Sequence, residues 1–409
     1  MRNRLPIAAL LTADAVSNTG NTIARIAIPW FVLEATGSAA LTGLAAFFTF
    51  LPVVISAFFG GALVDRFGFR RTSVAADLAS AAAVAAIPLV DALSGIEVWQ
   101  VMALVFVGAL LDAPGVTARE ALPPDLAELG SMRIERAAGL HGAIARGSVL
   151  IGAPLGGVLV ATLGTTTALW IDAASFVVSA LIVRTLVPSL RPHGHGEEDP
   201  TRYFAQLAEG VRFIASDRLL RAIVLTVLLT NFLDAPISSV VYPVLVRETF
   251  GGPEYLGLML GTFGGAAFVG SLAFGALGHR LRRRGVFVGC FFTCALMLLV
   301  ISTLPPFPVV LAALAVAGFA AGPLNPVIGA VEYERVPPRL RGRVFGAVTA
   351  GAWASIPLGT ILGGIAVQTL GVQTTLLLIG IAYVVVTGYG FFNAAFREMD
   401  DAEPVLQTA

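Results

Sequence analysis

Long apolar runs separated by short polar connections follow one another along almost the whole chain. Most runs hold about 20 mainly apolar residues, the length at which an α-helix crosses the hydrocarbon core of a bilayer. Within that core a helix satisfies its own backbone hydrogen bonds. The pattern therefore predicts an all-α membrane protein whose twelve transmembrane helices cover residues 5–33, 39–63, 72–93, 97–118, 139–162, 166–187, 220–246, 254–278, 285–304, 307–331, 344–369 and 373–396.

The composition is that of a protein embedded in lipid. Of the 409 residues, 56% are hydrophobic and only 13% are charged, against about 25% charged in a soluble domain. All 26 basic residues are arginines, whereas a nucleotide-binding Walker A loop requires a lysine. The formal net charge of +0 gives no basis for nucleic-acid binding. Since no cluster has metal-ligand or catalytic-triad spacing, we expect no nucleotide, nucleic acid, cofactor or metal, and no enzymatic activity.

Arginines are concentrated in every second connection between the predicted helices. The connections after the second, fourth, sixth, eighth and tenth helices hold most of them, including Arg119, whereas the connections in between hold Arg247 alone. Positively charged loops stay on the cytoplasmic side, which predicts that both termini are cytoplasmic. We expect no cleavable signal segment, because Asp14 interrupts the first apolar run. The lack of lysine is typical of a GC-rich bacterial genome, so we expect a multi-pass protein of the bacterial inner membrane.

The two halves of the sequence repeat each other at an offset of 214 residues. Pro29 and Gly43, for example, correspond to Pro243 and Gly257. This register predicts a duplicated six-helix unit, and an even number of crossings makes the two bundles parallel, related by a pseudo-two-fold axis along the membrane normal. We therefore expect an N-terminal bundle over residues 1–187, a cytoplasmic linker with an amphipathic helix over 188–218, and a C-terminal bundle with a short tail over 219–409. We expect the chain to be a monomer.

The connection after the second predicted helix contains a glycine- and arginine-rich motif. It reads Gly61-Ala-Leu-Val-Asp65-Arg66-Phe-Gly68-Phe-Arg70-Arg71 and resembles the G-x-L-x-D-R-x-G-R-[KR] signature of the major facilitator superfamily. Phe69 stands where that family usually has a basic residue, and a diverged copy covers residues 275–284. The resemblance implies the major facilitator fold, with this motif locking the two halves together at the cytoplasmic side. An ordinary positively charged inner loop is the alternative.

The fifth predicted helix contains a second motif, formed by Gly152, Pro154, Gly156 and Gly157. It resembles the G-P-x-x-G-G helix kink of drug antiporters in the same superfamily, with the proline displaced by one residue. A kink that serves packing alone is the alternative. The stretches 112–125 and 336–344 are similar to the macrolide-efflux and enterobactin-exporter branch, and within it to the mycobacterial Tap-type multidrug exporters. This resemblance implies proton-coupled export of small amphipathic compounds.

Polar residues line one face of the first predicted helix near the middle of the bilayer. Asp14, Asn18, Asn21 and Arg25 are spaced four, three and four apart, so they share a face. Ionisable groups at such depth are costly and indicate function. The superfamily resemblance implies that helices one, four, seven and ten line a central cavity. We therefore assign proton coupling or substrate contact to Asp14, Asn18, Asn21, Arg25, Asp112, Arg146, Asn231, Asp234 and Asn325.

Depth in the bilayer adds two predictions. Asp112 and Arg146 lie at similar depth on consecutive helices, which predicts an ion pair between them unless Arg146 extends towards water. Asp77 and Asp172 lie near predicted helix ends, and we expect them to be structural. For the remaining polar groups, hydrogen bonding between helices for packing alone is the alternative.

A carboxyl group removed from water takes up a proton readily, and such a group can bind a proton on one side of the membrane and release it on the other. We therefore expect a proton-coupled exporter of amphipathic small molecules that works by alternating access to a midplane cavity. Three alternatives stay open. They are an importer of a nutrient or siderophore on the same fold, a lipid or lysophospholipid flippase, and a transport-inactive sensor or scaffold.

Overall fold

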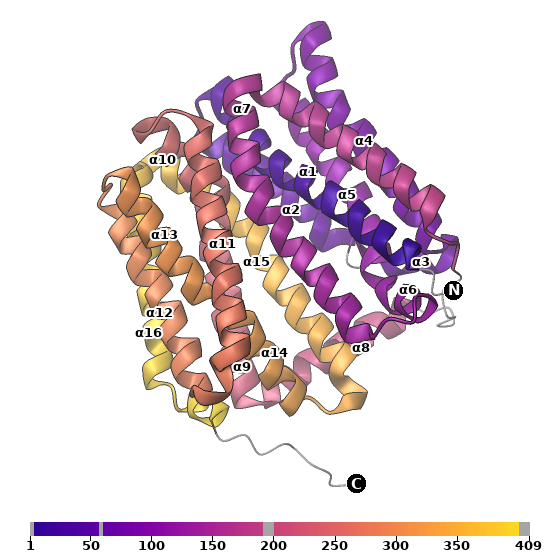
Figure 1. Cartoon of the computed structure of the whole chain (residues 1–409). Coiled ribbons are helices and arrows are strands. Elements are labelled where there is room, and N and C mark those ends of the chain that lie inside the picture. Colours follow the sequence, from indigo (N-terminus) through magenta and orange to yellow (C-terminus); the bar gives the residue numbers. More distant parts are fainter. Residues whose placement is uncertain (1–3, 57–59, 191–199, 401–409) are drawn as a thin grey trace. The chain divides into compact units, whose positions relative to one another are not determined.

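The computed structural model describes residues 4–56, 60–190 and 200–400, and within these ranges every regular element is a helix (Figure 1). The side chains of residues 60–62, 65, 135 and 200–206 lie outside the described part. The all-α fold class predicted from the apolar runs is therefore confirmed for the part of the chain that the structure covers.

Two compact units make up the chain, and each is described by itself. Unit 1 comprises Met1–Gly196 and Tyr242–Gly261, and unit 2 comprises Glu197–Val241 and Thr262–Ala409. The break after Gly196 falls inside the predicted linker. One segment of the second half of the sequence, Tyr242–Gly261, packs with the first half.

The helices of unit 1 are α1 (Leu5–Thr36), α2 (Ala39–Ser56), α3 (Gly60–Phe67), α4 (Phe69–Ser94), α5 (Val98–Ala121), α6 (Pro123–Leu129), α7 (Ile134–Leu186), α10 (Tyr242–Thr249) and the start of α11 (Pro253–Leu277). Those of unit 2 are α8 (Pro200–Ser216), α9 (Arg218–Pro236), η1 (Ile237–Val241), the rest of α11, η2 (Gly278–Arg280), α12 (Arg283–Ser302), α13 (Phe307–Ala321), α14 (Leu324–Arg335), η3 (Pro338–Leu340), α15 (Arg341–Leu370), α16 (Val372–Phe392) and η4 (Ala394–Met399).

Ten helical stretches among the described residues are long and apolar enough to cross a membrane. One of them, in α7, is divided into two arms at Gly164. In addition, α1 has 32 residues, roughly 48 Å at the rise of an α-helix, although Asp14, Arg25 and Glu34 lower its apolar character. With these two helices included, the described part accommodates the twelve predicted crossings.

The repeat of the sequence is also present in the backbone. Gly164, between the arms of α7, has φ 83° and ψ 163°, and Gly371, between α15 and α16, has φ 81° and ψ 161°. Gly37 and Gly251, which are related by the repeat offset, also have positive φ. Only glycine adopts such angles readily, so corresponding turns of the two halves depend on the same residue type. Figure 1 shows the two arms of α7 meeting at one end of unit 1.

The predicted amphipathic linker helix is α8, and it packs on α15 and α9 within unit 2. Gly210 lies against the main-chain carbonyl of Arg343 with no space for a Cβ atom. One residue earlier, the Glu209 carboxylate pairs with the Arg343 guanidinium. This contact and this ion pair fix the register of α8 on the beginning of α15.

Candidate transport site

A buried cluster of charged side chains lies inside unit 1, where α1, α4, α5 and α7 meet. Its centre is Arg119 on α5, whose side chain is 3% exposed. The Arg119 Nε atom lies 3.2 Å from Oδ1 of Asp14, Nη1 lies 2.5 Å from Oδ1 of Asp77, and Nη2 lies 3.7 Å from Oδ1 of Asp112. One guanidinium group thus contacts carboxyl groups from three helices.

Two further contacts, both from α7, complete the cluster. In the first arm, Nδ1 of His141 lies 3.2 Å from Oδ2 of Asp14, and the His141 side chain is 24% exposed. In the second arm, the Ser179 hydroxyl donates a hydrogen bond of 2.8 Å to Oδ2 of Asp77. The imidazole and the Asp112 carboxyl group, which is 19% exposed, are the parts of the cluster that reach the surface of the unit, whereas Asp14 and Asp77 are buried.

The local sequence explains how these side chains meet. Asp112 and Arg119 are two turns apart on α5 and therefore lie on one face. Gly115 lies between them, and a Cβ atom there would come 2.7 Å from Cβ of Ala76 on α4. Because Gly115 has no side chain, α4 approaches α5 closely and the neighbouring Asp77 reaches the guanidinium.

The charges of the cluster are unequal. Arginine keeps its positive charge in proteins, whereas Asp14, Asp77 and Asp112 could together carry a charge of −3. With His141 protonated the positive charge is still smaller, and uncompensated charge is costly where water is scarce. The cluster therefore holds more acidic groups than cations.

The predicted polar face of α1 runs from this cluster to the surface of unit 1. Asp14 is buried, Asn18 and Asn21 are half-buried, and Arg25 is exposed. The Asn21 side chain is a hydrogen-bonding neighbour of Asp112. The four residues therefore share one face of α1, as their spacing predicted, and Asp14 at one end of this face belongs to the cluster.

The predicted pair between Asp112 and Arg146 is wrong. Asp112 lies beside Arg119, and the side chain of Arg146 is exposed. The prediction assumed that α5 ends at residue 118, which would leave Arg119 in a connection, but α5 continues to Ala121. The continued helix places an arginine on the same face as Asp112, so a partner from the next helix is not required.

In unit 2 the predicted residues occupy a more open environment. Asp234 on α9 is exposed and accepts a hydrogen bond of 3.2 Å from the buried hydroxyl of Tyr383 on α16. Asn231, one turn earlier, donates to the carbonyl of Ala352 at 3.1 Å. Asn325, in the first turn of α14, is exposed. Unit 2 therefore presents a carboxylate, a phenol and a carboxamide, without an arginine bonded to Asp234 among its described residues.

The structure describes only part of the glycine- and arginine-rich motif, which lies in α3 and at the start of α4. The side chain of Asp65 and the surroundings of Gly61 lie outside the described residues. Gly68 begins α4 with φ 82°, Arg66 stacks on Phe67 with 5.3 Å between Cζ and the ring centroid, and Arg71 is exposed. The role of these residues in locking the halves stays a prediction.

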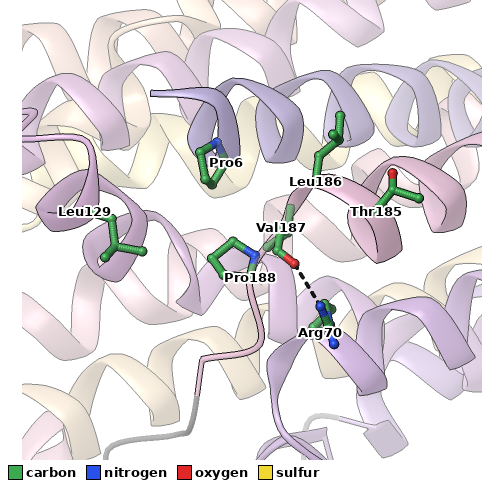
Figure 2. A pocket seen from close by; sticks show the side chains of 7 residues that line it. All are labelled: Pro6, Arg70, Leu129, Thr185, Leu186, Val187 and Pro188. Atoms are coloured by element: carbon green, nitrogen blue, oxygen red, sulfur yellow. Dashed lines mark hydrogen bonds between the residues drawn. The ribbon is translucent and has the colours of Figure 1, made fainter. Parts of the chain in front are cut away.

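Arg70 of this motif lines a hollow of about 380 Å³ at the N-terminal end of α4. Figure 2 shows its guanidinium turned towards the main-chain carbonyl of Val187, to which Nη1 donates at 3.4 Å. Val187 follows the last residue of α7, where main-chain carbonyls lack helical partners. Arg70 therefore ties the motif to the start of the linker within unit 1. The residues around the hollow are Pro6, Arg70, Leu129, Thr185, Leu186, Val187 and Pro188.

The glycines of the second motif, on α7, lie where this helix contacts other helices closely. A Cβ atom at Gly152 would come 3.0 Å from Cβ of Thr22, and one at Gly156 would come 3.1 Å from Cα of Ile23. Gly157 packs on α11, where its Cβ atom would lie 2.9 Å from Cα of Gly257. The helix continues through Pro154, and the backbone departs from helical angles at Gly164 instead. Close approach of α7 to α1 and α11 is thus what these glycines provide.

Five functional candidates were missed or misjudged from the sequence. Arg119 and Asp77 were placed near helix ends, and His141, Ser179 and Tyr383 gave no signal. No helix-breaking residue lies between Arg119 and Pro123, and Asp112 and Arg119 are spaced to share a helix face. The sequence could therefore have revealed the contact between Asp112 and Arg119. The other three reach the sites from distant parts of the chain, so their spacing carries no information.

Comparisons with known proteins identify the family. A family model described as a transmembrane secretion effector matches residues 4–407. The chain belongs to this family. The chain is 33% identical over 401 residues to the multidrug efflux pump Tap of Mycobacterium tuberculosis, covering 97% of this chain and 96% of Tap. It is 24% identical over 381 residues to macrolide efflux protein A of Streptococcus pyogenes, covering 92% and 93% of the two chains.

Solved structures have the same fold. A mutant form of the nucleoside transporter NupG matches this chain with a TM-score of 0.77 at 14% identity, over 96% of this chain and 99% of the other. At that identity the likeness concerns the fold alone. The major facilitator fold and the efflux branch expected from the motifs are confirmed, and the chain is a membrane transporter and not an enzyme.

Proposed function

We propose that this protein exports amphipathic small molecules, including antibiotics, in exchange for protons. The multidrug and macrolide efflux pumps among its relatives support the class of substrate and the direction. It would work by alternating access, as a monomer in the bacterial inner membrane, with substrate, protons and lipid as its partners. The distribution of arginines supports cytoplasmic termini.

The observation that carries proton exchange is the unequal charge of the buried cluster in unit 1. Three carboxyl groups share Arg119, and only His141, which is partly exposed, can add a positive charge. When a proton binds, the carboxyl oxygen that receives it loses its attraction to the guanidinium, and the contacts of Arg119 are redistributed. Protonation thereby changes the attachment of α1 to α4 and α5.

The polar groups of unit 2 suit the substrate. Asp234 is exposed and has an aromatic hydroxyl as its partner, and the ring centroids of Tyr383 and Phe291 lie 6.4 Å apart. A carboxylate beside aromatic rings attracts cations with apolar bodies. We infer a division of labour, with proton binding at Asp14 and its neighbours and contact with cationic substrates at Asp234.

Transport into everted membrane vesicles tests the proposed function. When respiration acidifies the lumen, vesicles with the wild-type chain should accumulate ethidium or erythromycin, and addition of either compound should make the lumen less acidic. The Asp14→Asn variant should lose both responses while its amount in the membrane is unchanged. Asp91→Asn, at the end of α4, is the matched control and should transport normally.

The same assay separates the rival functions. An importer that works by symport would expel preloaded substrate from the acidified lumen. A flippase would translocate a labelled lysophospholipid and leave the lumenal acidity unchanged. If the Asp14→Asn variant still exchanges substrate for protons, the coupling group is Asp112 or Asp234 and the assignment to Asp14 is wrong.

A further inference from the structure

Asp172 lies in the second arm of α7 and is buried without a polar partner. Its side chain is 1% exposed, and neither carboxyl oxygen has a hydrogen-bond partner among the described residues. The ion pairs of Arg119 involve Asp14, Asp77 and Asp112 and leave Asp172 out. Prediction from the sequence placed this residue near a helix end and treated it as structural, but its burial and lack of partners require a different explanation.

The carboxyl group is pressed against α1 at Gly20. A Cβ atom at Gly20 would come 2.6 Å from Oδ1 of Asp172 and would overlap the Ser175 hydroxyl. The absence of a side chain at Gly20 is therefore what lets the second arm of α7 approach α1 at this point. Such a contact leaves no space for water beside Asp172 at Gly20.

The hydroxyl group nearby matches a neutral carboxyl group better than an ionised one. Ser175 donates its own proton to the main-chain carbonyl of Asp172 at 2.8 Å, so its oxygen is left beside the carboxyl group as an acceptor. A protonated carboxyl group can donate to this oxygen, whereas a carboxylate cannot.

The charged groups on the neighbouring helices do not neutralise Asp172. These groups are Asp14, Arg25 and Glu34 on α1, Arg70, Arg71, Asp77 and Asp91 on α4, and Asp112, Arg119 and Glu120 on α5. Of the arginines, Arg70 donates to the carbonyl of Val187 and Arg71 is exposed. Arg119 is occupied by three other carboxyl groups, and Arg25 is exposed. Asp112 is near enough to act on Asp172 and carries the same sign of charge. An ionised Asp172 would therefore be an uncompensated buried charge.

We propose that Asp172 is a second proton-binding group, which holds its proton while α1 and the second arm of α7 are in contact and releases it when they separate. Release exposes a carboxylate that needs water, and the contact at Gly20 excludes water. Asp172 therefore loses its proton only when the contact at Gly20 opens. Since α1 also carries Asp14, Asn18, Asn21 and Arg25, the state of Asp172 is transmitted to the transport site. This inference rests on the proposed exchange of substrate for protons.

Infrared spectroscopy of the purified full-length protein tests the proposal directly. A protonated carboxyl group has a carbonyl stretching band that a carboxylate lacks. The wild-type spectrum should contain a band of this kind from Asp172, separate from any band of Asp14, Asp77 or Asp112. It should fade as the pH is raised and be missing from the spectrum of Asp172→Asn. The matched control is Asp77→Asn, because Asp77 is equally buried but ion-paired with Arg119, and this variant should keep the band. Thermal unfolding should show that Asp172→Asn, which imitates the neutral form, is folded and about as stable as the wild type.

Two results distinguish this inference from the proposed function. If the Asp172→Asn variant keeps the band while the wild type exchanges drugs for protons in vesicles, Asp172 is not the proton-binding group and the transport proposal stands. If the band belongs to Asp172 but wild-type vesicles move substrate without protons, the proton site exists and proton-coupled export is wrong. Unchanged exchange by Asp172→Asn at every pH would overturn the coupling of Asp172 to transport.

Discussion

At the residue scale, the side chain of Arg119 holds the buried acidic groups of unit 1 together. It is the cation that contacts Asp14, Asp77 and Asp112, which come from three helices of unit 1. Removing one member of a buried ion pair leaves the others as unpaired charges, which costs far more than the pair contributes. The guanidinium also donates in several directions at once, which an ammonium group does less well.

We predict that Arg119→Leu lowers the free energy of unfolding by about 3–5 kcal/mol, because it leaves buried carboxyl groups without a cation. Arg119→Lys should lie between this variant and the wild type. Equilibrium unfolding in mixed micelles measures the difference. Arg146→Leu, which removes an exposed arginine, is the control and should change stability by less than about 0.5 kcal/mol. Equal effects of the leucine variants would show that Arg119 is not the centre of the cluster.

At the scale of elements, glycines set the distances between helices. Gly115 brings α4 to α5, Gly20 brings α1 to the second arm of α7, and Gly157 brings the first arm of α7 to α11. Small residues at such contacts are the common way in which membrane helices pack closely. In this chain the same glycines also decide which polar groups meet.

We predict that Gly157→Ala destabilises the contact between α7 and α11 by about 1–3 kcal/mol. The added Cβ atom would lie 2.8 Å from the carbonyl oxygen of Pro253 and 2.9 Å from Cα of Gly257, and backbone atoms cannot move aside cheaply. Gly147→Ala is the control on the same helix, because nothing lies within 4 Å of its Cβ position. That variant should be neutral or gain up to about 1 kcal/mol from helix propensity. Thermal unfolding of both variants in detergent gives the comparison, and similar midpoints would contradict the packing argument.

At the scale of the whole molecule, the alternation of arginine-rich and arginine-poor connections predicts the orientation in the membrane. Ser94, the last residue of α4, is exposed beside an arginine-poor connection, and Glu128 in α6 is exposed in an arginine-rich one. The positive-inside rule therefore places these two residues on opposite sides of the membrane.

We predict that an impermeant maleimide labels Ser94→Cys in intact cells and labels Glu128→Cys only in everted vesicles. Both variants are made in a background with Cys290→Ser and Cys294→Ser, so that no other thiol reacts. The unsubstituted background protein serves as the blank. Labelling of Glu128→Cys in intact cells would reverse the orientation and, with it, the expected direction of transport.

The sequence by itself determined the number of membrane helices, the internal repeat and the family, because each depends on local apolar length or on residues that are neighbours in the chain. Spacing along a helix likewise placed Asp14, Asn18, Asn21 and Arg25 on one face. Only the tertiary structure decided where α5 ends, which acids share Arg119, and that the Asp172 carboxyl group has no hydrogen-bond partner among the described residues. Those facts depend on atoms brought together by helices from distant parts of the chain, and a side chain's charge and burial are properties of that assembled environment.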